Sequence, residues 1–595
     1  MQAVPVTPPA CANWADGQNI CPREGKLTCS SCKLVLYCGR ECQVNHWSEH
    51  KKSCRSLLRK SDWLPAWDLE GRVPAWNQGV AATNAHNPFG MGKHLWGNTP
   101  AMDVLQLYRN EGAGYSKDIA MLFAASGDLR NVVKTIQSLP EEFNHQIKMT
   151  INDRELGVAG RNAVLLLLVL NSLEEESSIA SINALAEILI HIWYSAMITA
   201  DMLSQLQSKV KPLIEEVCQR IANREPGVLL GKTWHFKSGS TLRLVLKKEE
   251  WARILTFIDI PEHFTPSRAR EARHSIVLAP ERKDYRDRWY FKDATLSMRI
   301  AKERFREDGL LLPFGHPRNG FDYPNPTIFQ ATGSWPLNDK EDPLRGWSVH
   351  EIRMTPWPAA EDLYGKLFFY FRSTMTTFIR QIATRKIHFQ LFNIDAIHLD
   401  QHLEKGAYDR IEASNITDES YLGTRETLRC LSPLMKLPQK NRHATLITIY
   451  QNAVMDTDGW TRQLNVVRGL NRVGKYLLDV DNIIGDNTQS AKLHRVWDAR
   501  RYTLDADMLF INYTIIKDFR QILKDLHMAM KGHNTIVDPW PTRLKLYPGQ
   551  PGAQEEFDNA LASPFSGVER YVEWKWAEHE CSYNDDITTE MMFFM

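Results

Sequence analysis

Long apolar runs are absent from this sequence. The longest is AVLLLLVL at residues 163–170, whereas a helix needs about 20 apolar residues to cross a bilayer. The first residues, MQAVPVTPPAC, hold no basic stretch followed by an apolar one, which is the pattern of a secretory signal. We therefore expect an intracellular protein, cytoplasmic or nuclear, without a membrane partner.

Net charge is also nearly absent, since 72 Lys and Arg stand against 71 Asp and Glu in 595 residues. A protein that neutralises phosphates needs a surplus of basic residues on its binding face, so a nucleic-acid partner is disfavoured. Hydrophobic residues make up 43% and charged residues 24% of the chain, which is typical of a folded globular protein. The length predicts several domains.

Cysteine is scarce after residue 54, where only Cys218, Cys430 and Cys581 occur, far apart in the sequence. A disulfide framework spanning the chain is therefore not expected. The seven other cysteines lie before residue 55, and such clustering favours a metal site. With one histidine they form a ligand-type set of Cys11, Cys21, Cys29, Cys32, Cys38, Cys42, His50 and Cys54.

The spacing of this set is C-x9-C-x7-C-x2-C-x5-C-x3-C-x7-H-x3-C. The C-x2-C pair allows a tight turn to aim two thiolates at one ion, and the two x3 pairs place both ligands on one face of a helix. Eight ligands make two tetrahedral sites, so we predict two zinc ions. His46 is a rival ligand, although its position four residues before His50 equally suits a helix surface.

Residues 11–54 resemble a MYND zinc finger, through Tyr37-Cys38, Cys42-Gln43, His46-Trp47, His50 and the final Cys54. The resemblance implies that the ligands interleave. Cys11, Cys21, Cys38 and Cys42 would hold one ion, and Cys29, Cys32, His50 and Cys54 the other. It also implies a protein partner that presents a short proline-rich segment, and hence an adaptor or regulatory protein.

Apolar runs and turn residues in the body predict an α/β fold. DIAMLFAASGDLRNVVKTI from residue 118 and HQIKMTINDRE from residue 145 each start as a strand that ends at a turn. Further strands are expected within residues 387–399, 408–416 and 443–454. Strands that alternate with helices predict a parallel sheet with helices on its faces.

The order of these strands resembles the S-adenosylmethionine-dependent methyltransferase fold, which is Rossmann-like. The resemblance implies cofactor-binding positions at Gly127 and Asp128 in the first turn, at Asp153 and at Asp395. Phe123 and Ala125 stand where that family has an acid and a glycine. We therefore predict a body without catalytic residues. The first alternative is an S-adenosylmethionine-dependent methyltransferase.

A second alternative is a DNA-binding transcriptional regulator, because residues 1–60 carry nine Lys or Arg against four Asp or Glu. The order of the segments ASGDLRNVVKTI, TINDRE, FREDGLLLPFGHPR and YDRIEASNITDESYLG resembles fungal MYND-finger proteins that carry a domain of unknown function. That domain type also resembles the amino-terminal part of cytoplasmic dynein-assembly factors. This resemblance implies no reaction.

The expected domain organisation has six parts. They are a zinc finger at 11–54, a Trp-rich connecting segment at 55–100, the first part of the Rossmann-like domain at 101–171, a largely helical insertion at 172–385, the second part of the domain at 386–460, and a helical and irregular region at 461–595.

Overall fold

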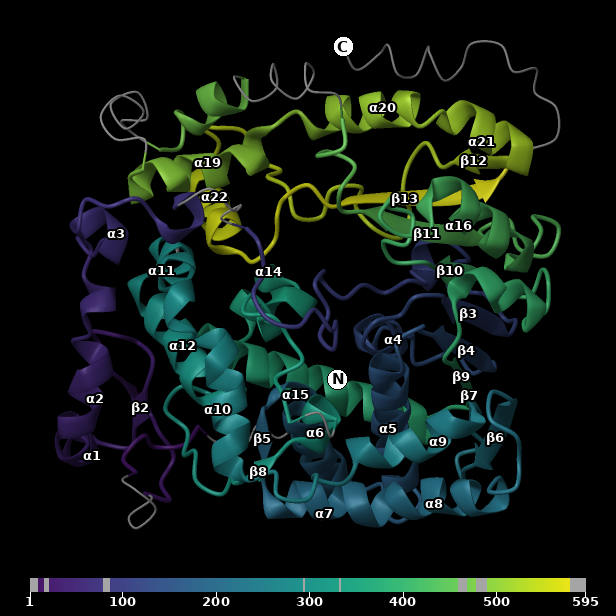
Figure 1. The fold of residues 1–595 in the computed structure, drawn as a ribbon, viewed down its shortest axis with the longest axis horizontal. Coiled ribbons are helices and arrows are strands. Elements are labelled where there is room, and N and C mark those ends of the chain that lie inside the picture. Colours follow the sequence, from purple (N-terminus) through teal and green to yellow (C-terminus); the bar gives the residue numbers. More distant parts are fainter. Residues whose placement is uncertain are drawn as a thin grey trace.

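A computed structural model describes residues 9–14, 21–78, 86–292, 295–330, 333–457, 468–477 and 489–577. The architecture is mixed α/β, with a nine-stranded sheet on one side of the molecule and the zinc-finger segment on the other (Figure 1). The expected α/β class is confirmed.

Five parallel strands form the centre of the sheet. They are β3 (Ile119–Phe123), β4 (Ile147–Asn152), β9 (Ile387–Phe392), β10 (Arg410–Glu412) and β11 (Thr445–Tyr450). The first strand lies in the middle, with β4 and then β9 on one side and β10 and then β11 on the other. All five lie within the segments that the sequence predicted as strands.

Four more strands extend the sheet at both edges. Beyond β11 lie the antiparallel β13 (Arg570–Trp576) and then β12 (Met528–Met530), and beyond β9 lie β7 (Thr241–Lys247) and β6 (Leu229–His235). Residues 172–385, predicted to be largely helical, contribute β6 and β7, and residues 461–595, predicted to be helical and irregular, contribute β12 and β13. These strands use the backbone hydrogen-bonding groups at the open edges of β9 and β11.

Helices cover the two faces of the sheet. On one face, α4 (Arg130–Gln137), α5 (Leu156–Ser172) and α15 (Leu363–Thr384) pack in one core with strand residues such as Met121, Met149 and Phe389. On the other, α16 (Gly423–Leu431), α20 (Ala506–Ile516) and α21 (Phe519–Leu526) pack with Leu122 and Ile411. The longest apolar run belongs to α5 and is buried in the first core.

The insertion forms most of the remaining body. Its helices are α6 (Ile179–Tyr194), α7 (Ala200–Lys209), α8 (Lys211–Arg220), α9 (Lys248–Ile254), α10 (Pro266–Val277), α11 (Lys283–Phe291), α12 (Leu296–Asp308), α13 (Pro326–Phe329) and α14 (Val349–Met354). A two-stranded sheet joins β5 (Met197–Ile198) to β8 (Tyr323–Pro324). Later in the chain come α19 (Ala491–Thr503) and α22 (Ala553–Ala562).

The Trp-rich segment is held against the body. Trp67 on α3 (Ala66–Leu69) and Trp76 are buried, and their rings lie edge to face at 5.2 Å. Arg72 pairs with Asp284 of α11 at 2.6 Å. This segment is therefore packed, as the sequence indicated. Among the described helices, none combines the length and apolarity needed to span a bilayer.

Candidate metal centre

The amino-terminal segment presents its cysteines and histidine from a hairpin and two short helices. Strands β1 (Leu27–Thr28) and β2 (Leu36–Tyr37) are joined by a turn that carries Cys29 and Cys32. Cys38 follows β2, and Cys42 lies on α1 (Arg40–Asn45). His50 and Cys54 are one turn apart on α2 (Trp47–Cys54). The predicted turn for Cys29 and Cys32 and the predicted helix for His50 and Cys54 are therefore found, whereas Cys38 lies before α1 and only Cys42 of that pair is helical.

One quartet consists of Cys11, Cys21, Cys38 and Cys42, whose sulfur atoms all lie within 4.8 Å of one another. The sulfur of Cys38 is 3.7 Å from that of Cys21 and 3.4 Å from that of Cys42. A disulfide would need about 2.05 Å, so these contacts are non-bonded. A zinc tetrahedron with bonds of about 2.3 Å has edges of about 3.8 Å, which these distances match closely.

The second quartet consists of Cys29, Cys32, His50 and Cys54, all buried. The Nε2 atom of His50 lies 3.4 Å from the sulfur of Cys29 and 3.6 Å from that of Cys32, and the sulfurs of Cys29 and Cys54 are 3.9 Å apart. These edges also fit a tetrahedral ion. Both quartets follow the interleaved pattern that the resemblance implied.

The electrostatics of the quartets favour a bound cation. Hydrogen bonds from Cys32 and His50 lower the pKa of the Cys29 thiol to about 3. Hydrogen bonds from the backbone and side chain of Arg23 lower that of Cys21 to about 6. Proximity to Cys29 and burial raise the pKa of Cys32 far above its usual value. The four thiols of the first quartet, or the three of the second, cannot all ionise without a compensating charge, and zinc supplies that charge.

His46, the rival ligand, belongs to neither quartet. Its Nδ1 atom lies 3.0 Å from the hydroxyl of Tyr37. Burial also lowers its pKa, which keeps the ring neutral. Tyr37 is buried at the centre of the finger, so the histidine serves to satisfy the tyrosine hydroxyl.

The finger is docked on the body along one side. The Oγ of Ser297 on α12 donates to the carbonyl of Cys32 at 2.7 Å, and the indole N–H of Trp14 donates to the carbonyl of Gly315 at 2.9 Å. Leu34 and Val35 are buried in the core shared with α15. The sequence gave no signal for this contact, because Ser297 and Gly315 lie more than 240 residues after the finger.

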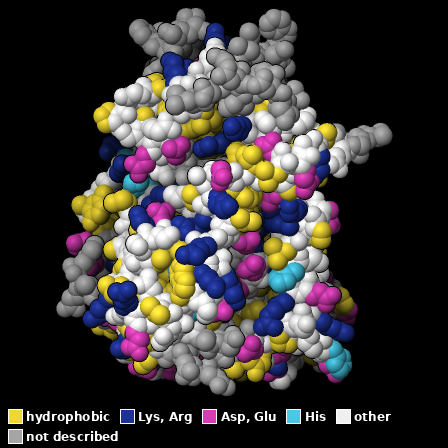
Figure 2. Space-filling model, turned by 90° about the vertical axis from the view of Figure 1, so that its left-hand side faces the viewer, with side chains coloured by type: hydrophobic (Ala, Val, Ile, Leu, Met, Phe, Trp, Pro, Cys, Tyr) yellow, Lys and Arg dark blue, Asp and Glu magenta, His cyan; other side chains and the backbone are white. Residues whose placement is uncertain are grey.

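The opposite side of the finger faces solvent. Val44 is 61% exposed, and Trp47, three residues on, is half-buried with the guanidinium of Arg55 5.2 Å from its ring centre. Leu27 and Leu57 are also exposed, although their neighbours Thr28 and Leu58 hydrogen-bond to Pro358 and Arg299 of the body. Figure 2 views the molecule from the finger side and shows apolar side chains lying next to Lys and Arg.

The predicted cofactor-binding residues lie at the carboxyl edge of the sheet. Their polar groups form hydrogen bonds and an ion pair with other residues of the chain. Gly127 has φ of +55°, and its N–H donates to a carboxylate oxygen of Asp153 at 3.0 Å. The other oxygen of Asp153 accepts from the N–H of Glu155 at 2.9 Å. Asp395 accepts from the N–H of Ile397 at 3.1 Å.

Asp128 is buried and structural. Its carboxylate pairs with Arg130 at 2.7 Å and accepts the N–H of Gly97 at 2.8 Å. Asn162 on α5, which the sequence did not single out, donates to the carbonyl of Gly127 at 2.7 Å. The turn after β3 is thus tied to α5 and to the segment before β3. Among the predicted residues, only Gly127 and Asp153 are joined by a hydrogen bond that the structure describes.

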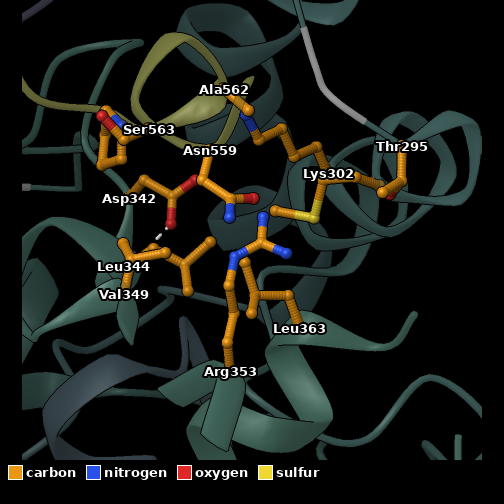
Figure 3. A pocket seen from close by; sticks show the side chains of 12 residues that line it. Thr295, Lys302, Asp342, Leu344, Val349, Arg353, Leu363, Asn559, Ala562 and Ser563 are labelled. Carbon is orange, nitrogen blue, oxygen red and sulfur yellow. Dashed lines mark hydrogen bonds between the residues drawn. The ribbon is translucent and has the colours of Figure 1, made fainter. Parts of the chain in front are cut away.

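A small pocket lies where Lys302 of α12, Arg353 of α14 and Asn559 of α22 converge (Figure 3). The carboxylate of Asp342 at its side accepts hydrogen bonds from Leu344 and Tyr364. Its volume is about 20 Å³, which is room for about one water molecule. It is too small for an organic ligand.

Comparison with known proteins agrees with the metal geometry. Residues 19–54 match the family model described as MYND finger, and residues 95–198 match one described as a domain of unknown function (DUF4470). The chain carries a MYND zinc finger. Its match includes seven of the eight ligand-type residues, with Cys11 lying before it. No solved structure matches the chain.

Proposed function

We propose that this protein is an adaptor or regulatory protein whose MYND finger binds a partner through a short proline-rich segment. Two zinc ions would be held, one by Cys11, Cys21, Cys38 and Cys42 and the other by Cys29, Cys32, His50 and Cys54. Zinc here supplies cross-links that fix the finger's shape, as in other structural sites with four protein ligands.

The observation that carries this proposal is the two-sided placement of the finger. Part of the finger is buried against α12 and the segment around Gly315, while Val44 stays exposed three residues before the half-buried Trp47. Proline rings pack well on aromatic faces, and an extended proline-rich segment loses little entropy on binding. Val44 and Trp47 are therefore the residues that we assign to partner contact.

An array of short peptides tests this proposal with the full chain. Each proline-rich peptide is paired with a version in which alanine replaces every proline, and binding is measured by fluorescence anisotropy. We expect a subset of proline-rich peptides to bind and their alanine versions to bind at least tenfold more weakly. Val44→Glu should weaken binding at least tenfold, because it places a charge on the contact surface.

Leu69→Glu is the matched control, since Leu69 is 69% exposed, against 61% for Val44, but lies on α3, outside the finger. It should leave peptide binding unchanged. Equal effects of both substitutions would reject the assigned surface. Equal binding of the proline and alanine peptides would reject the proline-rich partner.

We further propose that the body is a methyltransferase-like, Rossmann-like fold that serves as a non-catalytic scaffold. Its support is the strand order 3-2-1-4-5 from β9 to β11, with β13 inserted antiparallel next to β11. Doubly wound sheets have this kind of order and bind ligands at the carboxyl ends of their strands. The engagement of Asp128, Asp153 and Asp395 by the chain itself supports the non-catalytic assignment.

We also propose the domain boundaries expected from the sequence, which lie at residues 54, 100, 171, 385 and 460. The sheet itself is assembled from four of these segments. We also propose an intracellular location. A reducing compartment keeps thiols available as zinc ligands, and this supports that assignment.

A further inference from the structure

A polar cleft lies on the sheet near the amino ends of β4, β9 and β7, strands that Figure 1 labels on its right-hand side. Strand residues that pair across the sheet here are Lys148 with His388, His388 with Thr241, and Arg243 with Gln390 and with Thr233. The alternate residues Met149, Phe389 and Leu242 are buried in the core on the opposite face. The cleft has a volume of about 580 Å³.

The lining of the cleft is basic. It contains Lys148, Arg243, Lys436 and Lys440 against two acids, Asp118 and Glu404. Each acid has an exposed lysine as its sequence neighbour, at Lys117 and Lys405.

The four basic residues differ in how they are held. Lys436 is paired with the buried Asp409 at 2.7 Å, and the Lys148 ammonium lies 5.4 Å from the ring centre of Tyr408. Arg243 and Lys440 are exposed. The cleft therefore offers a positively charged surface to an anionic ligand.

An acidic segment of the same chain follows the last described residue, which lies on the Lys436 side of this cleft. Residues 578–595, which lie outside the described residues, contain five acids and no Lys or Arg; the acids are Glu578, Glu580, Asp585, Asp586 and Glu590. The described chain reaches Ala577, and the indole N–H of Trp576 donates to the carbonyl of Lys436 at 3.2 Å. Because Lys436 lines the cleft, the described chain ends near this part of the lining.

The length of the segment is sufficient. Eighteen residues can extend over roughly 60 Å, which exceeds the span of a cleft of this volume. Covalent attachment also gives the segment a high effective concentration, in the millimolar range for short flexible connections. Weak contacts between single carboxylates and exposed Lys or Arg therefore suffice for occupancy.

We propose that residues 578–595 bind in this cleft of their own chain, with their carboxylates against Lys148, Arg243 and Lys440. This contact is independent of the finger and of its partner. It covers a basic face of the sheet and weakens as salt screens the charges.

The test uses the full chain and a fluorescent peptide with the sequence of residues 578–595. In one protein the five acids are replaced (Glu578→Gln, Glu580→Gln, Asp585→Asn, Asp586→Asn and Glu590→Gln), which empties the cleft of its own segment. This protein should bind the peptide, and wild type should bind it at least tenfold more weakly because its cleft is occupied. A peptide with the same five replacements should not bind.

Charge reversal then locates the contact. In the amide-substituted protein, Arg243→Glu and Lys440→Glu should each weaken peptide binding several-fold, and Lys475→Glu, at an exposed lysine outside the cleft lining, should not. Equal peptide binding by wild type and the amide-substituted protein would overturn the proposal and leave the cleft to an acidic partner. Insensitivity to both cleft reversals would overturn it as well.

Discussion

The hydroxyl of Ser297 on α12 donates a hydrogen bond of 2.7 Å to the carbonyl oxygen of Cys32, a residue of the second quartet. The turn that carries Cys32 is thus hydrogen-bonded to the body through the backbone of Cys32 itself. Both Ser297 and Cys32 are buried. The finger and α12 are therefore joined at a residue of the second quartet.

Ser297→Ala should destabilise the docked finger. The substitution leaves the buried carbonyl of Cys32 without its side-chain donor, which costs about 1–3 kcal/mol. Urea unfolding followed by tryptophan fluorescence measures this cost. Ser275→Ala, at an exposed serine of α10, is the control and should change the unfolding free energy by less than about 0.5 kcal/mol.

Zinc content should distinguish the two quartets. The purified full chain should contain about two equivalents of zinc by elemental analysis, and Cys21→Ser or Cys11→Ser about one, because each removes a ligand of the first quartet only. His46→Ala should keep two, since its ring contacts Tyr37 outside both quartets. One equivalent in wild type would contradict the assignment of Cys11 and Cys21.

S-adenosylmethionine should give no heat in a calorimetric titration of the full chain, and neither should its demethylated product. The reason is that Asp153 accepts hydrogen bonds from Gly127 and Glu155 and so has both oxygens engaged. Asp153→Ala should also destabilise the fold, by about 1 kcal/mol, through loss of these contacts. Micromolar binding that disappears in Asp153→Ala would instead establish a methyltransferase-type cofactor site.

Stability should depend on pH through Glu412 on β10. Burial raises its pKa from 4.5 to about 7. The neutral form is thus preferred in the folded state, and the resulting stability is complete below about pH 4.5 and is lost as pH rises through about 7. Glu412→Gln keeps an acceptor for the N–H of Ser414.

The free energy of unfolding of Glu412→Gln, relative to that of wild type, should therefore increase by about 1–3 kcal/mol between pH 5.5 and pH 8. Urea unfolding at both pH values measures it. Glu555→Gln on α22 removes an exposed charge and serves as the control. A gain that is the same at both pH values would contradict the assignment to Glu412.

Local patterns predicted the five central parallel strands and the eight ligand-type residues, and the resemblance to a MYND finger implied how these residues divide into two quartets. Cys29 and Cys32 sit on one turn, and His50 and Cys54 on one helix, so sequence spacing fixes their geometry. The apolar runs of β3, β4 and β11 are buried along almost their whole length, and such runs identify strands without knowledge of their neighbours.

Contacts between distant segments were not predictable in this way. Strand β13 contains Glu573, a charge that argues against a buried strand, yet this residue is fully buried. Its carboxylate accepts from Lys531 at 2.9 Å and from the N–H of Ile536 at 2.7 Å. The hydrogen bond to Asp128 from the N–H of Gly97 is similar, because no local pattern shows that this acid is held by a segment 31 residues before it.

The pairing of β11 with β13 has a consequence for synthesis on the ribosome. Strand β11 ends at Tyr450 and its outer neighbour begins at Arg570, about 120 residues further along. At roughly 5–20 residues per second, the nascent chain carries an unpaired β11 edge for about ten seconds. Unpaired strand edges promote aggregation. A chaperone that binds the nascent chain until Trp576 has been synthesised would therefore protect the incomplete sheet.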